Sequence, residues 1–104
     1  MDLESAKAIA LEQLRNSGAD TLKECLIVDE YTRETPASWI FIYESKKWFE
    51  TRNSGDRLLG TIPILVDKAS GMVRGIRRTS DPLEVRIAKV EADIRSFLDS
   101  RPKQ

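Results

Sequence analysis

Residues 38–67 read SWIFIYESKKWFETRNSGDRLLGTIPILVD, two apolar runs joined by a polar connection that carries aromatic side chains. Within the first run, aromatic side chains alternate with isoleucines over residues 39–43, so a strand here has two apolar faces. Such a strand needs cover on both sides. Two arrangements remain open: helices and the connection share both faces, or one face stays partly exposed for a partner.

The second apolar run predicts a strand over residues 61–67. Pro63 has no N–H for a strand ladder, so we expect it at an edge, a strand start or a bulge. A bend at Gly60 should precede this strand. A hairpin turn with positive φ at Gly71 then leads into a last strand over residues 72–78.

Upstream of this stretch, the sequence predicts one helix and one strand. Asp2 is a suitable N-cap for a helix that runs to Arg15 with one apolar stripe, and Gly18 is expected to end it. Residues 22–32, LKECLIVDEYT, favour a strand. Residues 33–37 contain a proline and predict the turn into the central stretch.

The C-terminal part predicts a second helix with a strong start. Asp81 is expected as the N-cap, Pro82 at the first helical position and Glu84 as the partner in a capping box. Apolar residues then recur at helical spacing from Leu83 to Leu98, which predicts packing on a sheet. Residues 100–104 should fray.

These elements give an α+β fold: an N-terminal helix, a four-stranded antiparallel meander sheet and a C-terminal helix. The 104 residues fit a single domain over 1–104. No apolar run approaches the roughly 18 residues that span a membrane, and no secretory signal opens the chain, so we expect a cytoplasmic protein.

Composition narrows the chemistry. The chain has no histidine and one cysteine, which removes histidine-dependent catalysis and zinc sites, and Cys25 in its apolar run is expected to be a buried thiol. Carboxylate chemistry, a carboxylate-held Mg²⁺ or Ca²⁺, or no catalysis remain. Nothing in the sequence joins Glu50 and Asp67 as a catalytic pair. We expect no enzyme, no cofactor and no metal.

Charge is balanced overall, with 17 basic and 17 acidic residues. Residues 1–51 hold 6 basic and 10 acidic side chains, whereas residues 52–104 hold 11 and 7, so the halves carry −4 and +4. A neutral total argues against a nucleic-acid partner, although it leaves room for a local basic face.

Two segments have residues that folding explains least. Residues 46–59 form either a mobile surface loop or a partner-binding loop with an aromatic anchor. The last strand carries arginines, which either protect a sheet edge or recognise phosphate or carboxylate groups. The candidate partner-binding residues are Trp48, Phe49, Glu50, Arg52, Asp56, Arg57, Arg74 and Arg77.

A set of short motifs keeps its order and spacing across residues 39–95. The motifs are Trp39, Ser45, Phe49-Glu50-Thr51, Leu59-Gly60, Pro63, Val66-Asp67-Lys68, Ser70-Gly71, Thr79 and Pro82-Leu83-Glu84. As a set they resemble the immunity protein 35 family of bacterial polymorphic toxin systems, and small heat-stable, chaperone-like proteins look like members of the same group.

Three departures from the family pattern bear on any binding surface carried over from it. The family typically has Glu-Thr-Gly where this chain has Glu50-Thr51-Arg52. Because Arg52 replaces a glycine, the turn either has a different backbone geometry or tolerates a side chain. Gly-Asn-Ala-Pro becomes Gly60-Thr61-Ile62-Pro63, and Gly-Thr before the last helix becomes Arg78-Thr79.

The resemblance implies a non-enzymatic inhibitor that binds a cognate toxin and blocks it sterically, with Trp48 as an anchor. Because the arginine-bearing strand does not imitate a nucleic acid, the toxin is expected not to be a nuclease. Two other readings stay open. One is a holdase-like chaperone that uses an exposed apolar sheet face, and the other is a housekeeping module. The protein would be a monomer or a homodimer.

Overall fold

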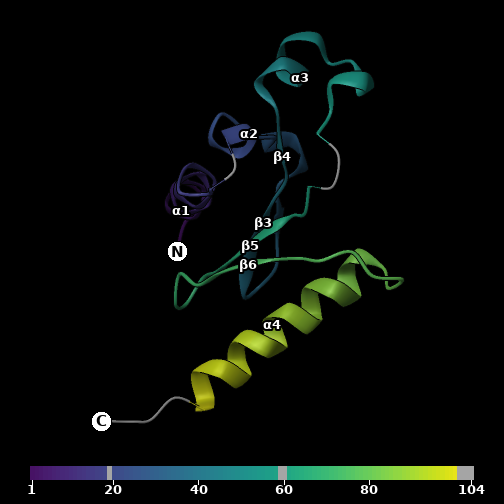
Figure 1. Cartoon of the computed structure of the whole chain (residues 1–104). Coiled ribbons are helices and arrows are strands. Elements are labelled where there is room, and N and C mark those ends of the chain that lie inside the picture. The colour runs from purple at the N-terminus through teal and green to yellow at the C-terminus, as the bar shows by residue number, and fades with distance from the viewer. Residues whose placement is uncertain (19, 59–60, 101–104) are drawn as a thin grey trace.

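The computed structural model describes residues 1–18, 20–58 and 61–100. The predicted bend at Gly60 and the predicted fraying of residues 101–104 lie outside these ranges, whereas Ser100, the first residue of the predicted frayed tail, is the last residue of α4. A sheet lies between two helices, with α1 on one side and α4 on the other (Figure 1). The elements in chain order are α1 Leu3–Arg15, α2 Asp20–Lys23, β1 Leu26–Ile27, η1 Asp29–Tyr31, β2 Arg33–Glu34, β3 Ser38–Phe41, β4 Tyr43–Glu44, α3 Lys46–Thr51, η2 Ser54–Asp56, β5 Ile64–Asp67, β6 Val73–Gly75 and α4 Leu83–Ser100.

The main sheet has four antiparallel strands in the order β2-β3-β5-β6. In its centre Ile40 of β3 pairs with Leu65 of β5, which in turn pairs with Arg74 of β6. The predicted four-stranded meander between an N-terminal and a C-terminal helix is therefore confirmed. Pro63 lies directly before β5, at one of the positions expected for it.

The strand predicted over residues 22–32 is wrong in most of its length. Its start belongs to α2, only Leu26 and Ile27 form β1, and the next strand, β2, lies within the predicted turn. The acidic pair Asp29 and Glu30 turns the chain into η1 instead, where Tyr31 N–H donates to the Val28 carbonyl at 3.0 Å. The short β1 pairs with β4 in a second, two-stranded sheet.

The apolar run of residues 39–43 bends at Ile42 rather than forming one straight strand. The Ile42 carbonyl accepts the Val28 N–H at 2.8 Å, which directs the chain from β3 in the main sheet to β4 in the small one. The segment from this bend through α3 to η2 extends away from the main sheet, to which β5 and β6 return (Figure 1).

Helix α1 covers one face of the sheet. Asp2 caps it as predicted, because its carboxylate accepts the Ser5 N–H at 2.8 Å. Ala6, Ala10 and Leu14 are buried in a cluster with Phe41, Tyr43, Ile64 and Val66. The helix ends at Arg15 with Asn16 as C-cap, two residues before the predicted stop at Gly18, since Asn16 N–H already donates to the Glu12 carbonyl.

Helix α4 covers the opposite face. Ile87 and Ile94 pack with Ile40, Leu65 and Ile76, all at most 5% exposed. A polar contact accompanies this packing, because the Glu91 carboxylate accepts the hydroxyls of Thr35 at 2.6 Å and Ser38 at 2.8 Å. Of the two arrangements that the sequence leaves open, the structure therefore has the one in which both faces are covered.

The start of α4 differs from the predicted capping box. The Pro82 carbonyl accepts the N–H groups of Val85 and Arg86, both at 3.1 Å, so Pro82 rather than Asp81 stands before the first helical residue. The Asp81 carboxylate instead binds Lys89 Nζ at 2.6 Å. Glu84 likewise pairs with Arg33 at 3.0 Å, across to β2.

The β5–β6 turn forms as predicted, with Gly71 at φ 76°. It is held by Asp67, which is 1% exposed. Burial alone would raise the pKa of the Asp67 carboxyl, but hydrogen bonds from the Ser70 hydroxyl and N–H and the ion pair with Arg95 outweigh it, so the pKa lies below its usual range. The ionised carboxylate therefore stabilises the fold.

We predict that Asp67→Asn lowers the free energy of unfolding by roughly 1–3 kcal/mol at neutral pH, because partners of the carboxylate lose a charged acceptor. Since the folded pKa is depressed, this difference is fully present above the unfolded pKa of about 3.9 and shrinks as pH falls through the folded value. Urea unfolding of both proteins between acidic and neutral pH measures it. A difference that persists unchanged into acid contradicts the assignment.

Truncation on α4 tests whether this helix is docked. Ile94→Ala should cost about 2–5 kcal/mol, because the side chain is fully buried and its removal leaves a cavity. Val85→Ala on the same helix, at a position 42% exposed, should change stability by less than about 0.5 kcal/mol. Equal costs for the two substitutions, measured by urea unfolding, would show that α4 is not packed as described.

Candidate functional site

Residues 46–58, which follow β4 and which we call the α3 connection, are held by their own hydrogen bonds. Ser45 caps α3 by accepting the Trp48 N–H at 3.2 Å, and its hydroxyl donates to the Asp56 carbonyl at 3.0 Å. Thr51 donates its hydroxyl to the Asp56 carboxylate at 2.6 Å. This bond and the nearby Lys47 ammonium lower the pKa of Asp56. The side chains of Ser45, Lys47 and Thr51 thus connect α3 to Asp56 of η2.

The two aromatic residues of α3 lie differently. Trp48 is buried at 5% exposure, whereas Phe49 is half-buried. Their rings meet edge to face at 82°, with centroids 5.2 Å apart. One ring therefore turns inward while its neighbour stays more exposed. Neither residue belongs to the two core clusters of the main sheet.

Arg52 ends α3 in the left-handed conformation, with φ 54° and ψ 19°. Its guanidinium lies 4.4 Å from the Trp48 ring centroid and 5.2 Å from that of Phe49. It also pairs with Glu30 of η1 at 2.9 Å. Because Arg52 stands where the family typically has glycine, the turn keeps a glycine-like backbone and tolerates a side chain.

Arg57 forms an ion pair with the buried Glu44, a residue that the sequence analysis missed. Glu44 is 1% exposed and accepts Arg57 Nε at 3.1 Å and the Leu58 N–H at 3.0 Å. These bonds join the end of β4 to the far end of the connection. The available signal was an acidic residue directly after the apolar run.

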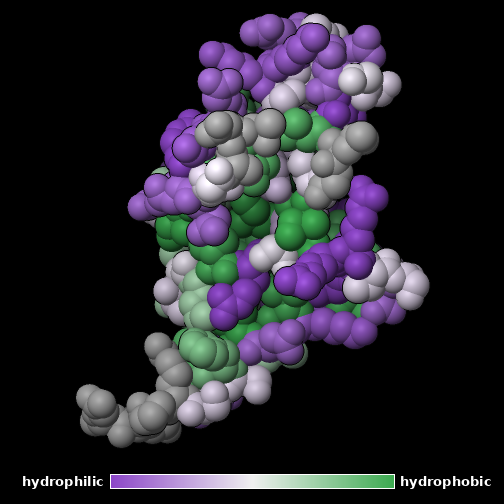
Figure 2. Space-filling view, in the orientation of Figure 1, coloured by the Kyte–Doolittle hydropathy of each residue, from purple (hydrophilic) through white to green (hydrophobic). Residues whose placement is uncertain are grey.

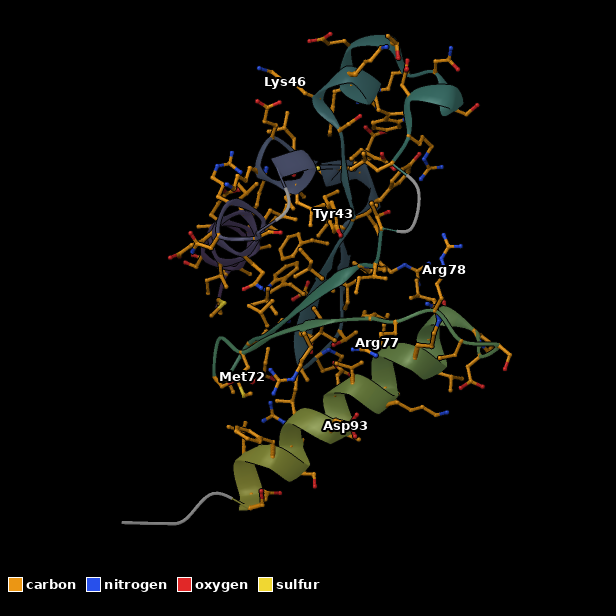
Figure 3. All side chains as sticks on the ribbon, viewed as in Figure 1. Tyr43, Lys46, Met72, Arg77, Arg78 and Asp93 are labelled. Carbon is orange, nitrogen blue, oxygen red and sulfur yellow. The ribbon has the colours of Figure 1, made fainter. Side chains whose placement is uncertain are left out.

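The eight candidate residues lie in two stretches of the chain. Trp48, Phe49, Glu50, Arg52, Asp56 and Arg57 lie in the α3 connection, whereas Arg74 and Arg77 lie on or after β6. β6 is an edge strand, as expected. Figure 3 places Lys46 at one end of the molecule and Arg77 with Arg78 near the start of α4. Glu50 is exposed in α3, and the Asp67 carboxylate is engaged by Ser70 and Arg95.

Within residues 1–18, 20–58 and 61–100, no group of three or more histidine, cysteine or acidic side chains could hold a metal ion. No helix in these ranges is long and apolar enough to cross a membrane. Cys25 is buried, as expected, and burial raises the pKa of its thiol above the usual value.

The backbone strain at Arg52 gives a stability prediction. Arg52→Gly and Arg52→Ala both lose the ring contacts and the Glu30 pair, but only glycine adopts φ 54° without a Cβ penalty. Arg52→Gly should therefore be about 1 kcal/mol more stable than Arg52→Ala. Urea unfolding measures this, and an alanine variant as stable as the glycine variant would contradict the left-handed cap.

Comparison with known proteins shows which family this chain belongs to. The chain matches the model of the family described as Immunity protein 35 over residues 4–90. It is 37% identical over 46 residues to "Uncharacterized protein YrhB" of Escherichia coli (strain K12), a match that covers 44% of this chain and 48% of that protein. The match thus spans about half the length of this curated relative. No solved structure matches the chain significantly. The chain belongs to the Immunity protein 35 family.

Proposed function

We propose that this protein is a non-enzymatic immunity protein that binds a cognate bacterial toxin and neutralises it by steric occlusion. The observation that carries this proposal is the family match over residues 4–90, which includes α1, both sheets, α3 and the first half of α4. The partner is then a protein, and inhibition requires a surface that is already formed before the toxin arrives.

The α3 connection supplies such a surface. The bonds from Ser45 and Thr51 to Asp56 fix its backbone, and the buried Trp48 supports Phe49 and Arg52 from below. A surface that is rigid before binding loses little conformational entropy on binding, which favours a tight complex. In this arrangement Phe49 provides apolar contact, while Glu50 and Arg52 provide charges at its rim.

The alternative function, a holdase-like chaperone, is less well supported by the structure. It needs an exposed apolar face of the central sheet, but Ile40, Phe41 and Leu65 are 0% exposed beneath the two helices. A holdase that used this face would have to release α1 or α4. Toxin binding by the α3 connection requires no such release.

Co-expression with the toxin encoded by the adjacent gene tests the proposal. The wild-type protein should restore growth and form a stoichiometric complex. Phe49→Ala should weaken that complex about tenfold or more, because truncation removes an aromatic contact near the centre of the surface. Affinity is measured by calorimetry or by surface-immobilised binding.

Phe97→Ala is the matched control, since Phe97 is an aromatic residue 48% exposed on α4, away from the α3 connection. It should leave the affinity within about twofold, the scatter of a surface substitution outside the contact. Failure of the wild-type protein to restore growth against the neighbouring toxin would sink the immunity function. Equal losses of toxin affinity in Phe49→Ala and Phe97→Ala would show that the α3 connection is not the surface that binds the toxin.

A further inference from the structure

Two hollows meet where β6 leads into α4. One, of about 200 Å³, lies between the Ile42 bend and the start of α4, and the other, of about 290 Å³, lies between the end of β6 and α4. Arg86 lines both, so the two hollows are neighbours. We call them together the arginine groove, after the basic residues that line it: Arg57, Arg74, Arg77, Arg78, Arg86 and Lys89.

The groove has a positive charge that its own residues do not neutralise. Asp93 is the one acidic residue among its described lining. Glu44 pairs with Arg57, and Asp81 pairs with Lys89. Glu84, whose carboxylate pairs with Arg33, also interacts electrostatically with Arg86, but within the described ranges no carboxylate lies at ion-pair distance from Arg77, Arg78 or Arg86. Figure 3 shows Arg77 and Arg78 on the segment between β6 and α4, with Asp93 further along the helix.

Arg86 shows most directly what the groove lacks. Its Nη1 donates to the Arg77 carbonyl at 3.3 Å, but its Nε is buried and has no hydrogen-bond partner among the described residues. A buried N–H without an acceptor destabilises a protein, because the lost hydration of the group is not offset by a hydrogen bond. A planar guanidinium is best satisfied by two oxygens of one carboxylate.

The remaining lining favours a peptide over a nucleic acid. Ile42, Ile62, Leu83 and Val90 offer apolar contacts beside the arginines. Figure 2 shows hydrophilic side chains gathered over α4 and the segment leading into it, next to hydrophobic ones of the sheet. The aromatic residue in the described lining, Tyr43, is buried at 6% exposure and so offers no platform for stacking bases. The neutral chain also lacks the strong basic charge typical of nucleic-acid binders.

We infer that the arginine groove binds an acidic segment of a protein partner, with carboxylates placed at Arg78 and Arg86 and apolar neighbours against Ile42 and Leu83. This inference rests on the proposed immunity function, in which the partner is the toxin. It assigns the toxin an acidic docking segment and adds a second contact region to the α3 connection. Arg78 and Arg86 thereby become binding residues.

Binding of a fluorescein-labelled hexaglutamate peptide, followed by fluorescence anisotropy at low salt, tests the groove without the toxin. The peptide should bind saturably, hexaglutamine should not, and added salt should weaken binding because the contacts are charged. Arg78→Ala should weaken binding roughly tenfold, as expected for a lost charge-assisted contact. Arg86→Gln should do the same, with its folding checked by thermal unfolding.

Arg15→Ala is the matched control, because it removes the same charge from an exposed position at the end of α1. It should leave peptide binding within about twofold. Arg78 is exposed, and its side chain makes no hydrogen bond or ion pair within the described ranges, so its variant decides the test even if Arg86→Gln unfolds.

Three results would overturn the inference: no saturable peptide binding, an equal loss in Arg15→Ala, or tighter binding of a single-stranded oligothymidylate that depends on the same arginines. These results are distinct from failure of the immunity function. Growth rescue with no peptide binding would remove only the groove, whereas peptide binding without rescue from the neighbouring toxin would remove the function.

Discussion

The structure depends on one constraint, the burial of both faces of β3. Successive residues of β3 point to opposite faces, so Phe41 lies on one face and Ile40 on the other. Each is fully buried under a different helix. Ala6 and Ala10 let α1 approach the sheet closely, while Ile87 and Ile94 fill the space beneath α4. A domain of this size has just enough helix for both tasks, so its two long helices are committed to the core.

Because the helices cover the sheet, surfaces for a partner must lie outside the layers. The bend at Ile42 carries the chain out of the main sheet and into the α3 connection, which is held by polar bonds around Asp56. The arginine groove lies where β6 runs out toward α4. Both proposed contact regions are therefore set at the ends of a scaffold that need not open.

The sequence predicts those elements whose signals are local. The Asp2 cap of α1, the apolar stripes of the two long helices, the alternation of β3 and β5 and the glycine at position 71 lead to correct predictions, because each depends on near neighbours. The two-residue strands β1 and β2 do not follow from sequence, since their partners are distant. Likewise, the sequence selects Trp48 and Arg77, but only packing reveals that Trp48 is buried and that Arg86 lacks an acceptor.

The central claim is that this protein meets its partner with preformed surfaces while its core stays closed. Hydrogen–deuterium exchange of the protein, alone and in complex with the toxin encoded by the adjacent gene, tests it most directly. The account predicts slower exchange over residues 46–57 and 74–89 and unchanged protection in β3 and β5. Faster exchange in β3 or β5 on binding, with no protection in those two regions, would contradict it.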